Sequence, residues 1–174
     1  MTALRKKSPE PMLIRKEAPE DLGAIFSLHA DSFVTDAEAH LVNDLREGGH
    51  LSLSLVAYDR SLIGHAAFSP MEFGDVKAAG LAPIAVAEGY RGQGIGRELI
   101  EKGMEDLKDM GYSTVFVLGS GKFYLRMGFQ RAIDYGIKPP YPRTKDNFFV
   151  KELIPDALRD AGNEISYGPE FGKL

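Results

Sequence analysis

The chain has 174 residues, of which 44% are hydrophobic and 26% charged, and it contains no cysteine. A chain of this length can build one full hydrophobic core but scarcely two, so we expect a single domain. The lack of cysteine excludes disulfides, thiolate metal sites and a cysteine nucleophile. The formal net charge is -4 with basic and acidic residues interspersed, which does not favour a nucleic-acid-binding surface.

The two ends of the chain differ from its middle. Residues 1–11 are basic and contain proline, which is typical of a flexible N-terminal arm. We expect the folded domain over residues 12–154 and a tail packed on it over residues 155–174, and the alternative for this tail is an added edge strand near residues 165–167. Neither a membrane span of ~20 apolar residues nor a secretory signal is recognisable, so the expected location is the cytoplasm.

The first half of the domain is predicted to contain a strand, two helices and a hairpin. A short strand over residues 12–15 precedes Pro19, which marks a helix start together with the acidic residues after it. A second helix is expected over residues 36–47, where two glycines end it. Two β-rich runs follow at residues 51–58 and 62–68, and their close spacing predicts a hairpin.

The second half is predicted to alternate strands and helices. Residues 78–87 form an apolar run that Pro83 interrupts, and a proline marks an edge, a bulge or a place where strands separate. The strongest helical pattern covers residues 94–110. A strand at 114–118, a short helix at 122–127, a strand from 129, a proline-rich loop at 138–142 and a last strand at 148–153 follow. The predicted class is α+β or α/β with a mixed sheet.

Three glycines, at positions 92, 94 and 96, lie between a strand and the strongest helix. Glycine lets backbone N–H groups converge, and a helix start adds unpaired donors and a positive dipole end, so this turn predicts a phosphate cradle. A dinucleotide fingerprint would need glycine where Arg97 stands, and a Walker loop would need serine or threonine where Phe123 stands. Both of these phosphate-binding motifs are therefore excluded.

The cradle run Arg91-Gly92-Gln93-Gly94-Ile95-Gly96 resembles the [QR]-x-x-G-x-[GA] pyrophosphate loop of the GCN5-related N-acetyltransferase (GNAT) superfamily. The run Phe123-Tyr124-Leu-Arg-Met-Gly128-Phe129 is similar to a second motif of that family, F-Y-x-x-x-G-F. The resemblance covers residues 12–154 and is greatest to a YhbS-like bacterial branch. It implies an α+β, three-layer fold with a mixed, mostly antiparallel sheet that splays at the acetyl-CoA strand and is flanked by helices.

The resemblance also implies an activity. It indicates an acyltransferase that uses acetyl-CoA as cosubstrate and passes the acetyl group directly to a primary amine of a small molecule or peptide. Because no cysteine can form an acyl-enzyme, sequential kinetics are predicted. The expected partners include no nucleic acid, membrane or metal, and a homodimer is left open. The alternatives are a module that binds acyl-CoA without turnover and an acyltransferase with a longer acyl donor.

The family pattern assigns cofactor binding to the strand before the cradle, to the cradle itself and to the residue before the short helix. Main-chain groups of Ile84 and Val86 would pair with the pantetheine arm, and a donor near Val86 would stabilise the developing oxyanion. Arg97 would reach an outer phosphate, and Ser120 stands near the position where the family often has asparagine. The expected cofactor-binding residues are Ile84, Ala85, Val86, Arg91, Gly92, Gln93, Gly94, Ile95, Gly96, Arg97 and Ser120.

Tyr124 matches the family's acid position, so it is the expected proton donor to the thiolate leaving group. Its alternative role is as a member of an aromatic core cluster. Glu72 is predicted as the general base, with Glu38, His65 and ordered water as the alternatives.

Acceptor recognition is expected on the first two helices and on one long connection. The helical candidates are His29, Phe33 and Glu38, and the loop candidate is Tyr141, which lies within residues 134–147. Prolines stiffen this loop, so it would form a wall of the acceptor cleft, and the alternative is an inert surface excursion. The four histidines of the chain show no metal-ligand spacing.

Overall fold

The computed structural model describes residues 12–159 and 161–173, so the expected arm over residues 1–11 lies outside the described residues. The described residues form a seven-stranded sheet in the order β1-β2-β3-β4-β5-β7-β6. Every neighbouring pair is antiparallel except β4 and β5. The strands are β1 (Leu13–Lys16), β2 (Leu53–Asp59), β3 (Ser61–Met71), β4 (Ala78–Val86), β5 (Thr114–Leu118), β6 (Gln130–Arg131) and β7 (Phe148–Glu152).

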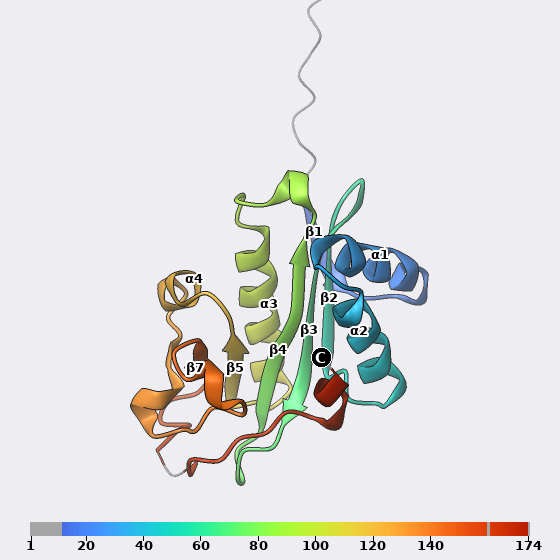
Figure 1. Cartoon of the computed structure of the whole chain (residues 1–174). Helices are drawn as coiled ribbons and strands as arrows, with labels where there is room; N and C mark the ends of the chain where they lie inside the picture. The colour runs from blue at the N-terminus through green and yellow to red at the C-terminus, as the bar shows by residue number, and fades with distance from the viewer. Residues whose placement is uncertain (1–11, 160, 174) are drawn as a thin grey trace, which may run out of the picture.

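Helices cover both faces of this sheet (Figure 1). They are α1 (Leu22–Ser32), α2 (Ala37–Glu47), α3 (Ile95–Asp109) and α4 (Gly121–Arg126), and short 3-10 turns are η1 (Pro19–Asp21), η2 (Glu88–Tyr90), η3 (Ala132–Tyr135), η4 (Pro142–Thr144) and η5 (Pro169–Lys173). The predicted hairpin is the β2–β3 pair, and the first predicted helix begins as the 3-10 turn η1. Among the described helices, none has the length and hydropathy of a membrane span.

Helix α3 packs on one face of the sheet at two glycines. A Cβ on Gly64 of β3 would lie 3.0 Å from Leu99 of α3, and a Cβ on Gly103 of α3 would lie 2.3 Å from the Phe68 ring. Leu99 and Phe68 are both fully buried in the main core cluster. The missing side chains therefore let the helix approach the strands closely, which explains a glycine in the middle of the strongest helix.

Helices α1 and α2 pack on the opposite face. Ile25 of α1, Val42 of α2 and Val56 of β2 form a small buried cluster there. Val56 pairs in register with His65, whereas the neighbouring Gly64 faces α3. This alternation follows from the two-residue repeat of a strand, which sends successive side chains to opposite faces.

Strand β4 separates from β5 halfway along its length. The two strands pair from Ala78 to Leu81, and β4 then continues alone on that side to Val86, while its other edge stays paired with β3. Pro83 lies just beyond the last β4–β5 pair and beside a register shift in the β3–β4 pairing, so two of its three predicted alternatives, the strand separation and the bulge, meet there. In Figure 1 the upper part of β4 rises beyond the end of β5.

The C-terminal segment runs back across the molecule to α2 (Figure 1). Phe171 of η5 is buried against Leu41 of α2. The edge strand expected near residues 165–167 is reduced to one β-bridge, between Glu72 and Ser166. The segment therefore brings aromatic side chains beside α2 rather than extending the sheet.

Candidate active site

A cleft of about 540 Å³ opens where β4 and β5 separate. It brings together five residues predicted for the site, which come from distant parts of the chain. They are Phe33, Glu38, Ile84, Tyr124 and Tyr141. The remaining lining residues are Leu41, Leu81, Ala82, Pro83, Val117, Leu118, Tyr167, Phe171 and Gly172.

The free edge of β4 presents main-chain groups toward the gap. Ala87 donates its N–H to Ile63 O at 2.8 Å, which directs its polar groups toward β3. Because these groups alternate along a strand, Ala85 also faces β3. Ile84 and Val86 therefore direct their N–H and C=O groups to the side from which β5 has separated. An extended ligand in the gap could take the hydrogen bonds that a neighbouring strand would otherwise make.

The glycine turn forms an open cradle at the start of α3. Gly92 and Gly94 have φ of 75° and 84°, and a Cβ on either would meet no atom of residues 12–159 and 161–173 within 4 Å. The first bond of the helix runs from Glu98 N–H to Gly94 O at 3.0 Å. The N–H groups of residues 95–97 therefore have no intrahelical partner and lie at the positive end of the helix dipole. This geometry fits a pyrophosphate.

The cradle's charged side chains have protein partners. Arg91 donates from Nε to Val86 O at 2.9 Å, so it ties the cradle to the free end of β4. Arg97 pairs with Glu101 at 2.8 Å on an exposed face of α3, and Gln93 is also exposed. Binding of an outer phosphate by Arg97 would therefore compete with Glu101.

Tyr124 lies on α4, beside the gap. Its side chain is 6% exposed and packs against Phe129 and Phe149, with ring centroids 5.5 and 6.2 Å away. Burial raises the pKa of Tyr124 to about 12, so the phenol carries its proton at neutral pH. Ser120, at the start of α4, is exposed and is not among the cleft residues. Tyr124 thus combines its expected aromatic packing with a place in the cleft.

Gly119 gives the Tyr124 ring its space. A Cβ at position 119 would lie 2.6 Å from Tyr124 Cε2, so any other residue would push the ring away from the end of β5. Gly119 was not among the residues predicted for the site. The sequence around Gly119 gives little indication of this role, because glycine is required there only to leave room for the ring of Tyr124, five residues later in the chain.

The candidate general bases Glu38 and Glu72 lie in different parts of the structure. Glu38 lines the cleft, and its Oε2 is buried without a hydrogen-bond partner in the described part of the chain. Glu72 follows the end of β3 and lines another hollow, with Pro139 and Ser166. Gly64 of β3 pairs with Val86 at the free end of β4. Glu72 lies eight residues after Gly64, which in an extended strand places it roughly 25 Å from that end of β4. The geometry therefore favours Glu38 over Glu72.

His29 and His65 lie in the interior, outside the cleft lining. His29 Nε2 and His65 Nδ1 are 2.7 Å apart, and His65 Nε2 is 2.7 Å from Ser54 Oγ. Burial lowers the pKa of His29 to about 4 and that of His65 well below its usual value. The His29 ring stacks on Phe33 at 6.0 Å. His29 thus supports a cleft residue instead of facing the cleft itself.

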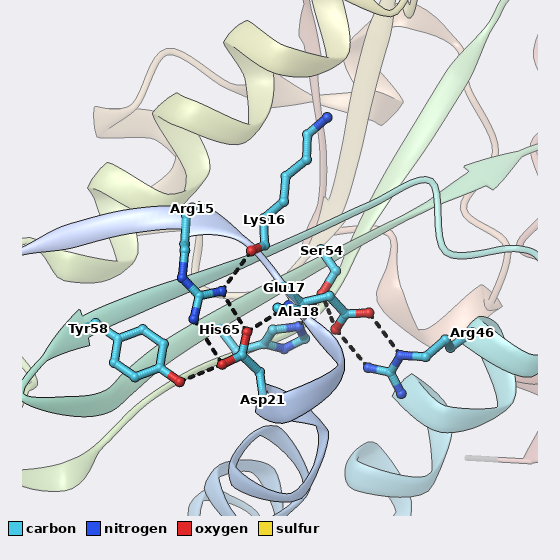
Figure 2. A network of polar contacts seen from close by, with 9 residues as sticks. All are labelled: Arg15, Lys16, Glu17, Ala18, Asp21, Arg46, Ser54, Tyr58 and His65. Carbon is cyan, nitrogen blue, oxygen red and sulfur yellow. Dashed lines mark hydrogen bonds and ion pairs between the residues drawn. The ribbon is translucent and has the colours of Figure 1, made fainter.

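A polar network fixes α1 against β1 and β2 (Figure 2). The Asp21 carboxylate accepts hydrogen bonds from Arg15 at 2.6 and 3.0 Å, and from the Ala18 N–H at 2.7 Å. Arg46 donates twice to Glu17 at 2.8 Å. The Arg15 interaction is the main reason why the pKa of Asp21 lies far below its usual range. The network sets the position of α1, which carries His29 and ends just before Phe33.

Three cleft residues, Tyr167, Phe171 and Gly172, come from the C-terminal segment and were not predicted. Tyr167 stacks on Tyr141 with ring centroids 6.1 Å apart and tilts against Phe171 at 4.5 Å. No local pattern marks Tyr167 or Phe171, because their role depends on how the segment packs against α2. Within the described residues, no group of three His, Cys, Asp or Glu side chains is placed to hold a metal.

Sequence comparison relates the chain to acetyltransferases. The acetyltransferase (GNAT) family matches residues 19–129. The Escherichia coli K12 protein YhbS, named an uncharacterized N-acetyltransferase, is 42% identical over 167 residues, which are 94% of this chain and 100% of YhbS. YjhQ of the same strain, also named an uncharacterized N-acetyltransferase, is 39% identical over 70% of this chain and 72% of its own length.

Solved structures give the same relationship. The crystal structure of the E. coli GNAT family N-acetyltransferase YhbS in complex with CoA has a TM-score of 0.90 and 40% identity, covering 95% of this chain and 96% of that chain. A GNAT family acetyltransferase from Brucella melitensis, in complex with acetyl-CoA, has a TM-score of 0.77 and 29% identity, covering 92% and 98% of the two chains.

Proposed function

The chain belongs to the GNAT family of acetyltransferases, and on this premise we propose that it transfers the acetyl group of acetyl-CoA directly to a primary amine. The observation that carries the proposal is the separation of β4 from β5 beside an open cradle at the start of α3. The gap fits the pantetheine arm, the cradle fits the pyrophosphate, and Tyr124 of α4 lines the gap. The relatives solved with CoA and acetyl-CoA support this placement.

The proposed reaction forms a C–N bond and breaks a C–S bond. The amine nitrogen attacks the thioester carbonyl, whose developing oxyanion is stabilised by the N–H group of Val86. The tetrahedral intermediate then expels the CoA thiolate, which takes the proton of the Tyr124 hydroxyl, and the second proton of the former amine nitrogen passes to the Tyr124 phenolate and restores it. Glu38, whose buried Oε2 has no hydrogen-bond partner in the described part of the chain, accepts the proton that the ammonium gives up. Products are the acetamide and CoA-SH.

The acceptor class and setting complete the proposal. We propose a small-molecule or peptide amine as acceptor, and the cytoplasm, where the sequence predicts this chain, as the location. The homodimer that the sequence left open stays a prediction. Retention of acetyl-CoA without turnover would instead identify a binding module.

The test measures acetyl-CoA binding by calorimetry and CoA-SH release with a thiol reagent across amines, amino acids, polyamines and lysine peptides. The chain has no cysteine, so the enzyme adds no thiol signal. We expect release that depends on the amine and sequential kinetics. Tight binding with no release from any acceptor would refute catalysis.

A matched pair of variants tests the cradle. Gly94→Glu places a carboxylate beside the pyrophosphate site, so we expect acetyl-CoA affinity to fall at least about 100-fold. Gly49→Glu carries the same charge change at a similar φ of 72°, also in open space, but lies after α2. Wild-type affinity in Gly94→Glu would overturn the cradle assignment, whereas Gly49→Glu is expected to bind normally.

A further inference from the structure

The cleft has two chemically different halves. One half is the strand gap, bounded by β4, β5 and Tyr124, which the proposed function assigns to the acyl donor. The other half is lined by Phe33, Glu38, Leu41, Tyr141, Tyr167 and Phe171. These residues come from the α1–α2 region, the loop after β6 and the C-terminal segment. The acceptor has to enter through this second half.

The second half carries one negative group. Among the described residues that line the cleft, Glu38 is the only charged one. Its Oε2 is buried and has no partner among the described residues. A buried carboxylate oxygen without a donor is costly, and a bound cation offsets that cost. The electrostatics of this half therefore favour a positively charged ligand.

The wall beside Glu38 is aromatic. The rings of Tyr141 and Tyr167 are 13° from parallel, and those of Tyr167 and Phe171 are 34° from parallel, so the three form a continuous stack. Aromatic faces attract ammonium groups and pack well against apolar groups. Burial raises the pKa of Tyr167 well above its usual value, so its phenol is neutral at physiological pH. The wall adds no second charge.

The same lining disfavours other acceptors. No arginine, lysine or histidine is among the cleft residues that the structure describes. A carboxylate or phosphate on the acceptor would be desolvated beside Glu38 without a cation to pair with. Further ammonium groups on a polyamine would meet aromatic faces but no second carboxylate, so they would lose hydration without gaining a counter-charge. Glu38 can therefore balance one positive charge on the acceptor.

We infer that the acceptor is a primary amine with a single positive charge on an apolar body, such as an alkylamine or an arylalkylamine. Glu38 holds the ammonium group, and the stack of Tyr141, Tyr167 and Phe171 packs against the body. This inference rests on the proposed function, because it names the acceptor of that reaction.

Two matched pairs of acceptors test whether the cleft prefers an amine with a single positive charge. Phenethylamine and L-phenylalanine share an aromatic body and differ by a carboxylate, while n-hexylamine and spermidine differ in the number of charges. We expect kcat/KM for each monocation to exceed that of its partner by at least about tenfold. A preference for L-phenylalanine or spermidine would overturn the inference and leave acetyl transfer intact. Absence of release with every amine would refute the proposed function itself, and with it this inference.

A second pair tests Glu38. In Glu38→Gln we expect the KM for phenethylamine to rise at least about tenfold while acetyl-CoA affinity stays unchanged. Glu47→Gln makes the same change at an exposed position of α2 and is expected to keep the wild-type KM. A Glu38→Gln variant that lowers only kcat would show that Glu38 moves a proton without holding the ammonium, and would overturn its role in selecting the acceptor.

Discussion

His29 Nε2 and His65 Nδ1 lie 2.7 Å apart, and a distant carboxylate determines which of them carries the proton. Ser54 donates its hydroxyl proton to Glu17 Oε2 at 2.7 Å, so it must accept from His65 Nε2. His65 Nδ1 is then an acceptor, and His29 donates to it from Nε2. His29 Nδ1 is therefore left as a buried acceptor to which none of the described residues donates. Both rings are neutral in this arrangement.

Stability is predicted to fall in mild acid. The pKa of His29 is about 4 in the fold and 6.5 in an unfolded chain, so between these pH values the unfolded state binds a proton that the folded state does not. The contribution of His29 to the free energy of unfolding is therefore complete above pH 6.5, and it decreases by about 3 kcal/mol as the pH falls to 4. The pKa of His65 is lowered in the same way, so His65 adds to the loss of stability in acid. Urea unfolding at a series of pH values measures it.

Variants of two histidines identify the source of this dependence. His29→Gln keeps a donor toward His65 and is expected to flatten the decrease in unfolding free energy. His40→Gln changes a histidine whose side chain is 60% exposed, and it should leave the decrease as in the wild type. Equal pH dependence in the wild type and in His29→Gln would contradict the prediction.

Two glycine-to-alanine substitutions are predicted to act in opposite directions. Alanine is the better helix former, but a Cβ at Gly103 would lie 2.3 Å from the Phe68 ring, so we expect Gly103→Ala to destabilise by about 2 kcal/mol through overpacking. A Cβ at Gly23 of α1 meets nothing within 4 Å, and Gly23→Ala should stabilise by about 0.5 kcal/mol. Thermal unfolding measures both, and a stabilised Gly103→Ala would show that α3 moves freely away from β3.

The Asp21 network is predicted to hold α1 in place. Asp21→Asn replaces a buried carboxylate that accepts two hydrogen bonds from Arg15, so we expect a loss of about 2 kcal/mol in unfolding free energy. Asp156→Asn is the control, because its pair with Arg159 is exposed on both sides and such pairs contribute little. A pair of variants with equal unfolding midpoints in urea would refute the structural role of the network.

Local signals predicted the parts of the fold that depend on backbone chemistry. Pro83 indicated an edge, a bulge or a strand separation, and the pairing of β4 with β5 ends just before it, at Leu81. The glycines at 92 and 94 predicted a cradle, and both have positive φ at the start of α3. These features depend on a few adjacent residues, so the sequence carries them directly.

The parts of the site that depend on distant packing were less accessible. Strand β3 continues to Met71, three residues past the predicted end, and this carries Glu72 away from the cleft. His29 showed a helical pattern but not its contact with His65, which is 36 residues away in the chain. Tyr167 reaches the cleft only because the C-terminal segment returns to α2. None of these positions has a local sequence signal.

Substitution of Tyr124 tests whether this residue takes part in the reaction or only packs in the aromatic core. If its hydroxyl protonates the thiolate, Tyr124→Phe removes the proton donor but keeps the ring between Phe129 and Phe149. We expect kcat to fall about 100-fold with acetyl-CoA affinity unchanged. Because burial raises the pKa of Tyr124 to about 12, the donor stays protonated and the wild-type kcat should not decline from this group below about pH 10.

Tyr112→Phe is the matched control for this substitution. Tyr112 is 7% exposed, close to the 6% of Tyr124, and its hydroxyl donates to Ser52 at 2.8 Å away from the cleft. Its loss should cost about 1 kcal/mol of stability and leave kcat unchanged. Steady-state kinetics and thermal unfolding of the two variants therefore separate the roles. If Tyr124→Phe also keeps the wild-type kcat, Tyr124 is an aromatic core residue and the thiolate takes its proton from water.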